Sequence, residues 1–261
     1  MILSRRASLN NVQLDELHDA IVIRSIDPGV TSESVSSASR MSGFGSRLTG
    51  QHWDTLEAHV TYAINVPHTD LAKRSEIFDL VNTWAHQAEG GAWLKFNTLE
   101  GRRMRVDKVI YPNRGDLWNW DTDEYTITFR AYNVPFWQDS ELTTVTGKTA
   151  ASGTLTIPVG GNRTTVLSAT FENKSGKEIS RFEIEAGGNK IELNDIALGG
   201  SETLTIRHGY DGILRITAGS RNVYGKYTGS DDLYIEPGDV TVKYTATRAG
   251  ILTAQVYGRW I

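Results

Sequence analysis

The residues best suited to ligand chemistry are tyrosines in the second half of the chain. Tyr224 and Tyr227 lie near Tyr210 and Tyr234, among Gly, Asn and Asp residues. An aromatic ring exposed on a β-sheet is able to stack on a sugar ring, whereas a tyrosine at the rim of a core mainly packs and keeps its hydroxyl hydrated. A structural role in the core or at its rim is the commoner one for such tyrosines, and we name Tyr224 and Tyr227 as the candidate glycan-binding residues beside it.

A second candidate is the densest group of positive side chains. It consists of Arg102, Arg103, Arg105, Lys108 and Arg114. The whole chain has a formal net charge of -4, which excludes binding of nucleic acid through bulk positive charge. We expect a solvated strand face or a subunit contact with acidic neighbours, with phosphate contact as the alternative.

Catalytic and metal-binding patterns fail when their spacing is examined. The chain has no cysteine, and its six histidines form no zinc-binding pattern. Gly147-Lys148-Thr149 lacks the earlier glycine of a phosphate-binding loop, and Ser201 lacks the closing glycine of a nucleophile elbow. We assign no catalytic, cofactor-binding or metal residue and expect a protein that is not an enzyme. A glycan hydrolase stays open as a third choice, because 31 acidic residues offer many carboxylate pairs.

The distribution of tryptophan divides the 261 residues into two parts. Only Trp260 lies in the second part, and the first part contains Trp53, Trp84, Trp93, Trp118, Trp120 and Trp137. The change falls in residues 138–153, which are rich in Thr, Ser, Ala and Gly and suit a connector. We therefore predict domains at 1–140 and 141–261. No run of about 18 apolar residues occurs, so we expect no membrane-spanning helix and folding in a cytoplasm.

The first part has the pattern of an α+β domain with an antiparallel sheet and one main helix. Alternation predicts strands at 20–26, 56–66, 92–96, 103–111 and 124–132, and the strand at 103–111 should place Met104, Val106 and Ile110 on one face. Apolar residues at spacings of three and four predict one helix between Asp70 and Gly90-Gly91. Residues 31–50 are dominated by Ser, Gly and Thr, and we expect a long mobile loop there.

The second part has the pattern of an all-β sandwich or jelly roll. Apolar residues alternate through 167–171, 182–184 and 240–246, and Gly-rich turns recur between these segments.

These segments, in this order, resemble the distal tail proteins of long-tailed, siphovirus-type bacteriophages. The first resemblance runs through His59-Val60-Thr61-Tyr62, the helix at 74–84, Trp93-Leu94-Lys95-Phe96, Tyr125-Thr126-Ile127-Thr128-Phe129 and Pro135-Phe136-Trp137. The second covers Phe171-Glu172-Asn173-Lys174-Ser175-Gly176, Phe182-Glu183-Ile184 and Ile235-Glu236-Pro237-Gly238-Asp239-Val240, which are similar to the family's galectin-like sandwich. Val134 stands where family members have an aspartate before the proline.

The resemblance implies a structural virion protein that acts by assembly. Such proteins form a hexameric ring hub at the tip of the tail tube, made by the N-terminal domains, with the C-terminal domains projecting outward. The ring joins the tube protein to the tail-tip protein or tail-associated lysin, and carries receptor-binding components that contact the host or its glycan. It implies no cofactor, no membrane and no sequence-specific nucleic acid. The alternative function is a carbohydrate-binding module of a tail or cell-wall-associated protein, for which the tyrosines are the discriminating feature.

Overall fold

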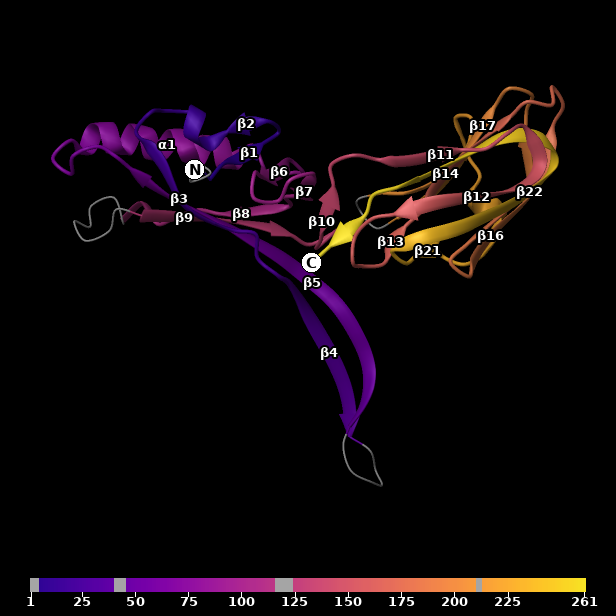
Figure 1. Cartoon of the computed structure of the whole chain (residues 1–261), viewed down its shortest axis with the longest axis horizontal. Coiled ribbons are helices and arrows are strands. Elements are labelled where there is room, and N and C mark those ends of the chain that lie inside the picture. The colour runs from indigo at the N-terminus through magenta and orange to yellow at the C-terminus, as the bar shows by residue number, and fades with distance from the viewer. Residues whose placement is uncertain (1–4, 40–45, 116–123, 210–212) are drawn as a thin grey trace. The chain divides into compact units, whose positions relative to one another are not determined.

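The chain folds into two compact units, which consist of Met1–Trp137 with Ile261 and of Gln138–Trp260. The computed structural model describes residues 5–39, 46–115, 124–209 and 213–261, without the side chains of residues 33–52. Figure 1 shows helix α1 (Leu71–His86) and both short and long strands in the first unit, and strands throughout the second. Among the described residues, no helix is long and apolar enough to cross a membrane.

The first unit is built on an antiparallel sheet in the order β3-β5-β9-β8, with β4 paired to β5. The strands are β3 (Ile21–Asp27), β4 (Thr31–Ser39), β5 (Ser46–Ile64), β8 (Lys108–Ile110) and β9 (Glu124–Ala131). The paired strands β5 and β9 bury alternate residues, as the period of two predicts. The strands expected at 20–26, 56–66 and 124–132 are confirmed as β3, β5 and β9.

Helix α1 (Leu71–His86) packs on this sheet through aromatic side chains. The ring centroids of Phe78 and Tyr125 are 5.4 Å apart, and those of Trp84 and Phe129 are 6.0 Å apart. The Asp70 carboxylate caps the helix by accepting a hydrogen bond of 3.1 Å from the backbone N–H of Lys73. The prediction of one helix on an antiparallel sheet is confirmed.

A buried arginine fastens the helix to the sheet. Arg74 is 1% exposed and donates hydrogen bonds to the Val66 carbonyl at 2.8 Å, the Ile64 carbonyl at 3.3 Å and the Tyr125 hydroxyl at 2.8 Å. The helix and both central strands are thus joined by polar contacts inside the apolar core. In the same core, burial, followed by the nearby Tyr125, raises the pKa of the Tyr62 hydroxyl far above its ordinary value.

Short elements complete the first unit beside the main sheet. Strands β1 and β6 pair antiparallel, with β2 and β7 on their outer sides. Their bounds are β1 (Ala7–Leu9), β2 (Val12–Gln13), β6 (Trp93–Phe96) and β7 (Arg102–Arg105), and a short 3-10 helix, η1 (Leu14–Glu16), follows β2.

Residues 31–50 are not the loop that the sequence analysis expected. Strand β4 pairs with β5 from Thr31 opposite Leu56 to Ser39 opposite Ser46. The expectation was wrong because alternation detects a strand only where one of its faces is buried, and this segment has few apolar residues and no regular alternation. Residues 40–45 lie outside the described residues.

The single strand expected at 103–111 is two strands in two different sheets. β7 pairs with β6, whereas β8 pairs with β9. Met104, Val106 and Val109 are buried, but Ile110 is 41% exposed, so the predicted common face for Ile110 is wrong. The Asp107 carboxylate lies at the break and accepts hydrogen bonds from the backbone N–H groups of Tyr132 at 2.8 Å and Asn133 at 3.0 Å.

The second unit is all-β, and its large antiparallel sheet folds around one apolar core. Strand β22 (Gly238–Val256) joins the two parts of this sheet, because residues 238–246 pair with β12 and β15, whereas residues 251–256 pair with β14 and β11. The other elements are β11 (Thr143–Thr146), β12 (Ala150–Val159), β13 (Thr165–Val166), β14 (Ser168–Asn173), β15 (Ile179–Ala186), β16 (Asn189–Leu198), β17 (Thr203–His208), β18 (Leu214–Ala218), β19 (Arg221–Asn222), η3 (Tyr224–Lys226), β20 (Tyr227–Gly229) and β21 (Tyr234–Ile235).

The apolar residues that alternate in the sequence meet in this core. Leu167, Phe171, Phe182 and Val242 are each at most 1% exposed. The prediction that the second part is built from β-strands around one apolar core is confirmed.

The chain enters the second unit at β10 (Trp137–Asp139) and leaves it at β23 (Arg259–Trp260). The Asp139 carboxylate accepts hydrogen bonds from Trp260 Nε1 at 2.7 Å and from the backbone N–H of Gly258 at 3.1 Å. These bonds tie the entering and leaving strands of this unit together.

Candidate functional surfaces

The most extended feature of the first unit is the arm, which we define as β4 and residues 46–55 of β5. Residues 56–63 of β5 pair with β9 and residues 59–64 pair with β3, whereas the described residues 46–53 pair only with β4. In Figure 1 the arm runs clear of helix α1 and of strands β8 and β9. The outer part of the arm is thus a two-stranded ribbon without a sheet to support it.

The base of the arm is fixed by the segment Pro135-Phe136-Trp137. Trp137 Nε1 donates a hydrogen bond of 3.0 Å to the Pro28 carbonyl, and the Thr31 hydroxyl donates to the Pro135 carbonyl. The rings of Trp53 and Phe136 meet edge to face with centroids 6.1 Å apart. In the sequence this segment is visible only as part of the resemblance to distal tail proteins, and no pattern in it indicates its role at the arm.

A glycine makes the turn into the arm possible. The Asp27 carboxylate accepts a hydrogen bond of 2.8 Å from the backbone N–H of Gly29, whose φ is +68°. A Cβ atom at Gly29 would lie 1.5 Å from the Glu57 carbonyl oxygen, so no other residue fits there without a backbone shift.

The tryptophans of the first unit do not share one role. Trp84 and Trp137 are each 2% exposed and each donates Nε1–H to a backbone carbonyl at 3.0 Å, so both are core residues. Trp53 and Trp93 are half-buried. Trp118 and Trp120 lie outside the described residues.

The basic set is dispersed and pairs locally. Lys108 Nζ lies 3.0 Å from Glu89, and both Arg114 terminal nitrogens contact the Asp79 carboxylate, at 3.0 and 3.1 Å. The Arg103 guanidinium lies 3.9 Å from the centre of the Trp93 ring, an arrangement that favours a cation–π interaction. The hydrogen bond from Lys108 is the main reason that the pKa of Glu89 is lowered from its ordinary value. These contacts fit the expected pairing with acidic neighbours and leave phosphate binding without support.

Candidate residues Tyr224 and Tyr227 lie together at the edge of the large sheet in the second unit. Their ring centroids are 5.4 Å apart and their planes are inclined by 42°. Tyr224 is 46% exposed in η3, whereas Tyr227 begins β20 and packs against the core. The structure therefore brings the two candidates together but gives them different environments. Tyr234 is exposed on β21, and Tyr210 lies outside the described residues.

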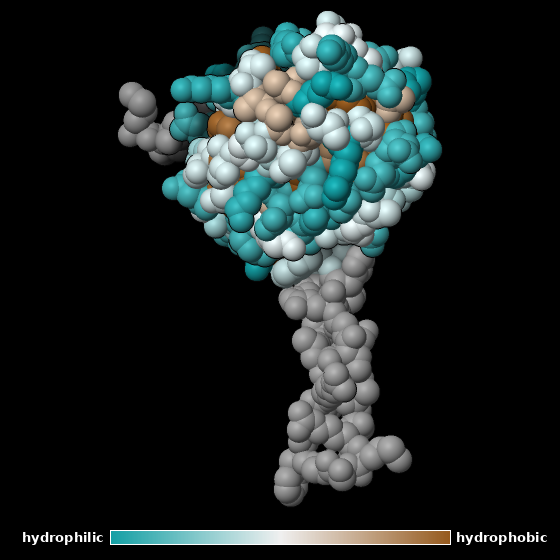
Figure 2. Space-filling model, turned by 90° about the vertical axis from the view of Figure 1, so that its right-hand side faces the viewer, coloured by the Kyte–Doolittle hydropathy of each residue, from teal (hydrophilic) through white to brown (hydrophobic). Residues whose placement is uncertain are grey.

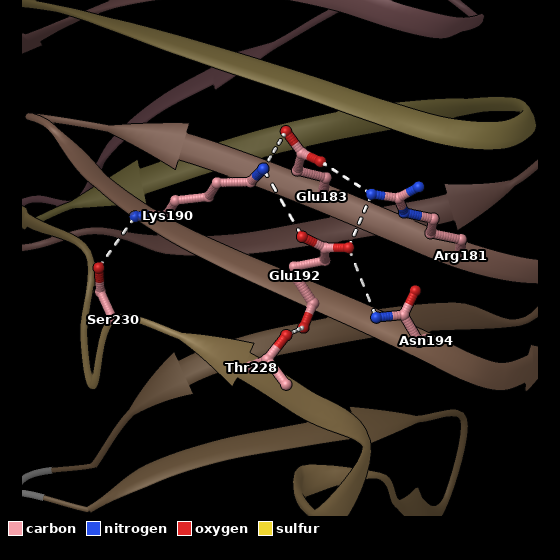
Figure 3. A network of polar contacts seen from close by, with 7 residues as sticks. All are labelled: Arg181, Glu183, Lys190, Glu192, Asn194, Thr228 and Ser230. Atoms are coloured by element: carbon pink, nitrogen blue, oxygen red, sulfur yellow. Dashed lines mark hydrogen bonds and ion pairs between the residues drawn. The ribbon is translucent and has the colours of Figure 1, made fainter.

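Beside this edge, the outer face of β15 and β16 carries a network of charged side chains (Figure 3). Glu183 and Glu192 lie directly opposite each other on the two strands, which alone would be repulsive. Arg181 bridges both at 3.6 and 2.7 Å, and Lys190 bridges both at 2.9 and 3.6 Å. The hydrogen bond to Glu183 is the main cause that raises the pKa of Lys190. The network balances two negative charges with two positive ones and joins the strands.

The surface of this unit in Figure 2 is mostly hydrophilic, with apolar residues visible only in small areas. A large apolar patch, the usual mark of a permanent protein interface, is therefore absent from the described residues on this face. Among the described residues of the chain, no group of three or more His, Asp or Glu residues is placed to hold a metal ion.

A polar turn holds one end of the second unit. Asn173 is fully buried, and its Nδ2 donates to the carbonyls of Lys177 at 2.7 Å, Leu198 at 3.1 Å and Gly199 at 2.9 Å. Its Oδ1 accepts from the backbone N–H of Ser175 at 2.9 Å and from the Ser175 hydroxyl at 2.8 Å. This asparagine is a structural turn residue.

Comparison with solved structures shows a fold shared over the whole chain. The chain is similar to the SPP1 Dit (gp 19.1) protein, described as a paradigm of the hub adsorption apparatus in phages that infect Gram-positive bacteria. The TM-score is 0.67 at 13% sequence identity, and the match covers 98% of this chain and 99% of the other. A chain of the phage P2 baseplate in its activated conformation matches with a TM-score of 0.48 at 9% identity, over 97% and 98% of the two chains. No protein-family pattern and no curated protein matches the sequence.

Proposed function

We propose that the chain is a structural bacteriophage virion protein without enzymatic activity, located at the distal end of a tail and assembled in the host cytoplasm. Six copies form a ring hub that joins the tail tube protein to the tail tip or baseplate, including a tail-associated lysin and receptor-binding components for host attachment. The full-length likeness in fold to the SPP1 Dit protein carries this proposal. The order of sequence segments that resembles distal tail proteins supports it independently.

Within this proposal the two parts of the chain have separate tasks. Residues 1–140 form the ring, and residues 141–261 form a galectin-like sandwich that projects outward and docks partners. The absence of a large apolar patch on the viewed face of the second unit fits a unit outside the permanent ring contacts.

The arm supplies the physical reason for assembly. An isolated two-stranded ribbon is at best marginally stable in water. The outer part of the arm is such a ribbon among the described residues, so contact with a neighbouring subunit is expected to stabilise it. A cyclic ring needs two different complementary surfaces on each subunit. We assign one of them to the arm and the other to the first unit of the next copy.

A shortened arm tests this assignment. Val35 and Gln51 are paired across the arm, so replacing residues 36–50 by Asn-Gly closes the ribbon with a two-residue turn and keeps its base. Light scattering over a dilution series should give six-fold mass for the natural chain and monomer mass for the shortened one. The variant Tyr224→Ala, which alters only the second unit, should keep the ring. A shortened chain that still forms the same ring would overturn the role of the arm.

The second candidate function is a carbohydrate-binding module of a tail or cell-wall-associated protein. The pairing of Tyr224 with Tyr227 at an exposed sheet edge favours it. Glycan binding by a chain that never forms a ring, alone or with tail proteins, would support this candidate over the hub.

A further inference from the structure

The turn that carries Tyr224 is fixed by its backbone before any ligand binds. The Asn222 side chain accepts a hydrogen bond of 2.9 Å from the backbone N–H of Tyr224. The preceding Val223 is 7% exposed and its backbone N–H donates to the Ile216 carbonyl at 2.9 Å. The position of Tyr224 is thus set by the sheet and by the turn together.

The ring of Tyr227 packs against the exposed ring of Tyr224 and is itself held in place. Its hydroxyl donates to the Ser230 carbonyl at 2.6 Å and lies 3.3 Å from the Asp231 carboxylate. Burial, followed by the Asp231 charge, raises the pKa of this hydroxyl above its ordinary value. Figure 3 shows Thr228 and Ser230, which follow Tyr227 along the chain, bonded to residues of β16. Tyr227 is thus fixed by its hydroxyl as well as by the core.

An exposed ring held against a fixed one is a preorganised stacking surface. Ordering a mobile aromatic side chain opposes binding, and the contact with Tyr227 lowers that cost for Tyr224. A sugar ring has one face of C–H groups for the aromatic ring and hydroxyls at its rim. The exposed Asp231 carboxylate, near Tyr227, is an acceptor for such hydroxyls.

The charged groups around the tyrosines are of both signs. Asp231 is exposed, as is Lys226 between the two tyrosines, and the buried Asp232 lies with Oδ2 at 3.1 Å from His208 Nε2. The site thus offers sugar hydroxyls an acceptor, Asp231, and a donor, Lys226.

We infer that Tyr224 is the stacking surface of a saccharide subsite for a pyranose unit of a surface glycan. Tyr227 supports the ring and Asp231 accepts a hydroxyl. This inference rests on the second candidate function and gives it a site. It is compatible with the hub, whose outer unit would then hold the host glycan.

Saturation-transfer NMR with the full chain tests the subsite. The probes are the methyl glycosides of glucose, galactose and N-acetylglucosamine, with methyl glucuronide as the charged counterpart. A single ring bound in this way is expected to have a dissociation constant of about 1 mM, which the method detects. Saturation should reach the ring C–H protons of at least one of the four glycosides.

Two tyrosine variants separate stacking from general surface effects. Tyr224→Ala should weaken binding about tenfold, as expected for the loss of one stacked ring. Tyr132→Ala removes a ring of similar exposure, 45% against 46%, from the first unit and should bind like the natural chain. Tyr224→Trp should retain binding, which shows that the ring is required rather than the hydroxyl.

Three results would overturn the inference. They are no saturation of any of the four glycosides, equal binding by Tyr224→Ala and the natural chain, and equal loss in Tyr132→Ala and Tyr224→Ala. Mass by light scattering is measured on the same samples. A ring that forms without glycan binding then rejects the subsite alone, whereas a monomer that binds glycan rejects the hub alone.

Discussion

Replacing Trp137 by phenylalanine should loosen the arm, and replacing Trp84 by phenylalanine should not. Both indoles are 2% exposed and both donate Nε1–H to a backbone carbonyl at 3.0 Å. They differ in what they hold, because Trp137 bonds to Pro28 at the base of the arm and Trp84 bonds to Val12. The two variants thus remove the same chemical group from two places in one unit.

The expected loss of stability is similar for both variants. The smaller ring leaves a cavity that costs about 1–2 kcal/mol, judged from the larger cost of truncation to alanine. The lost hydrogen bond and the carbonyl left without it add about 1–2 kcal/mol. Each variant should therefore lose about 2–4 kcal/mol, which lowers the Tm of this unit by about 10 °C.

Hydrogen exchange followed by mass spectrometry separates the two variants. Trp137→Phe should lower the protection of residues 31–39 and 46–55 and reduce the fraction of assembled chain at a given concentration. Trp84→Phe should lower protection near α1 and β2 and leave the arm unchanged. If Trp84→Phe loosens the arm as much, or Trp137→Phe leaves it fully protected, the proposed clamp at the base of the arm is wrong.

Two further predictions concern the second unit. Asn173→Ala removes five hydrogen bonds of a buried side chain and should destabilise this unit by about 3–5 kcal/mol, measured by calorimetry. The control Asn194→Ala changes an exposed side chain and should cost less than about 0.5 kcal/mol. Equal Tm values for the two variants would contradict this prediction. The pKa of Glu202 is lowered in the folded chain, chiefly by the hydrogen bond from the Gly199 backbone N–H. The ionised carboxylate therefore stabilises the folded unit at pH values above the pKa of Glu202 in the unfolded chain. This stabilisation is lost as the pH falls through the lower pKa of Glu202 in the folded chain. Thermal unfolding from about pH 6 to about pH 3 should show a smaller acid loss for Glu202→Gln than for the natural chain, and parallel curves would refute the role of Glu202.

The sequence predicted the parts of the fold in which one face of an element is buried. Strand β9 buries Tyr125, Ile127 and Phe129 on one side, so its alternation is complete and its bounds were nearly correct. The arm gave no such signal, because the periodic pattern reports burial and the few apolar residues of the arm do not alternate regularly. Its strands follow from backbone pairing, which leaves little trace in residue types.

The break between β7 and β8 was hidden for a different reason. Alternation of Met104 and Val106 continues in the sequence toward Ile110, although the chain changes sheets at Asp107. The only local signal was a carboxylate inside an apolar pattern, which is typical of a turn as well as of a solvated strand face.

The sequence predicted Tyr224 and Tyr227 as a pair of candidate residues, but not that one ring would be exposed and the other anchored. Tyr224 and Tyr227 are three residues apart in a Gly-rich segment, and nothing in that spacing separates the exposed ring from the anchored one. The difference arises from register, because Tyr227 pairs with Leu193 on the core side of β16, whereas Tyr224 precedes the strand. In the same way, only the packing in the folded chain distinguishes the core residues Trp84 and Trp137 from a tryptophan at an interface.

The absolute mass of the purified natural chain tests the central claim most directly. Light scattering across a dilution series, with negative-stain microscopy of the same peak, should show a six-fold assembly with a central opening. A chain that remains monomeric at every concentration, both alone and mixed with a tail tube protein, would contradict the ring hub.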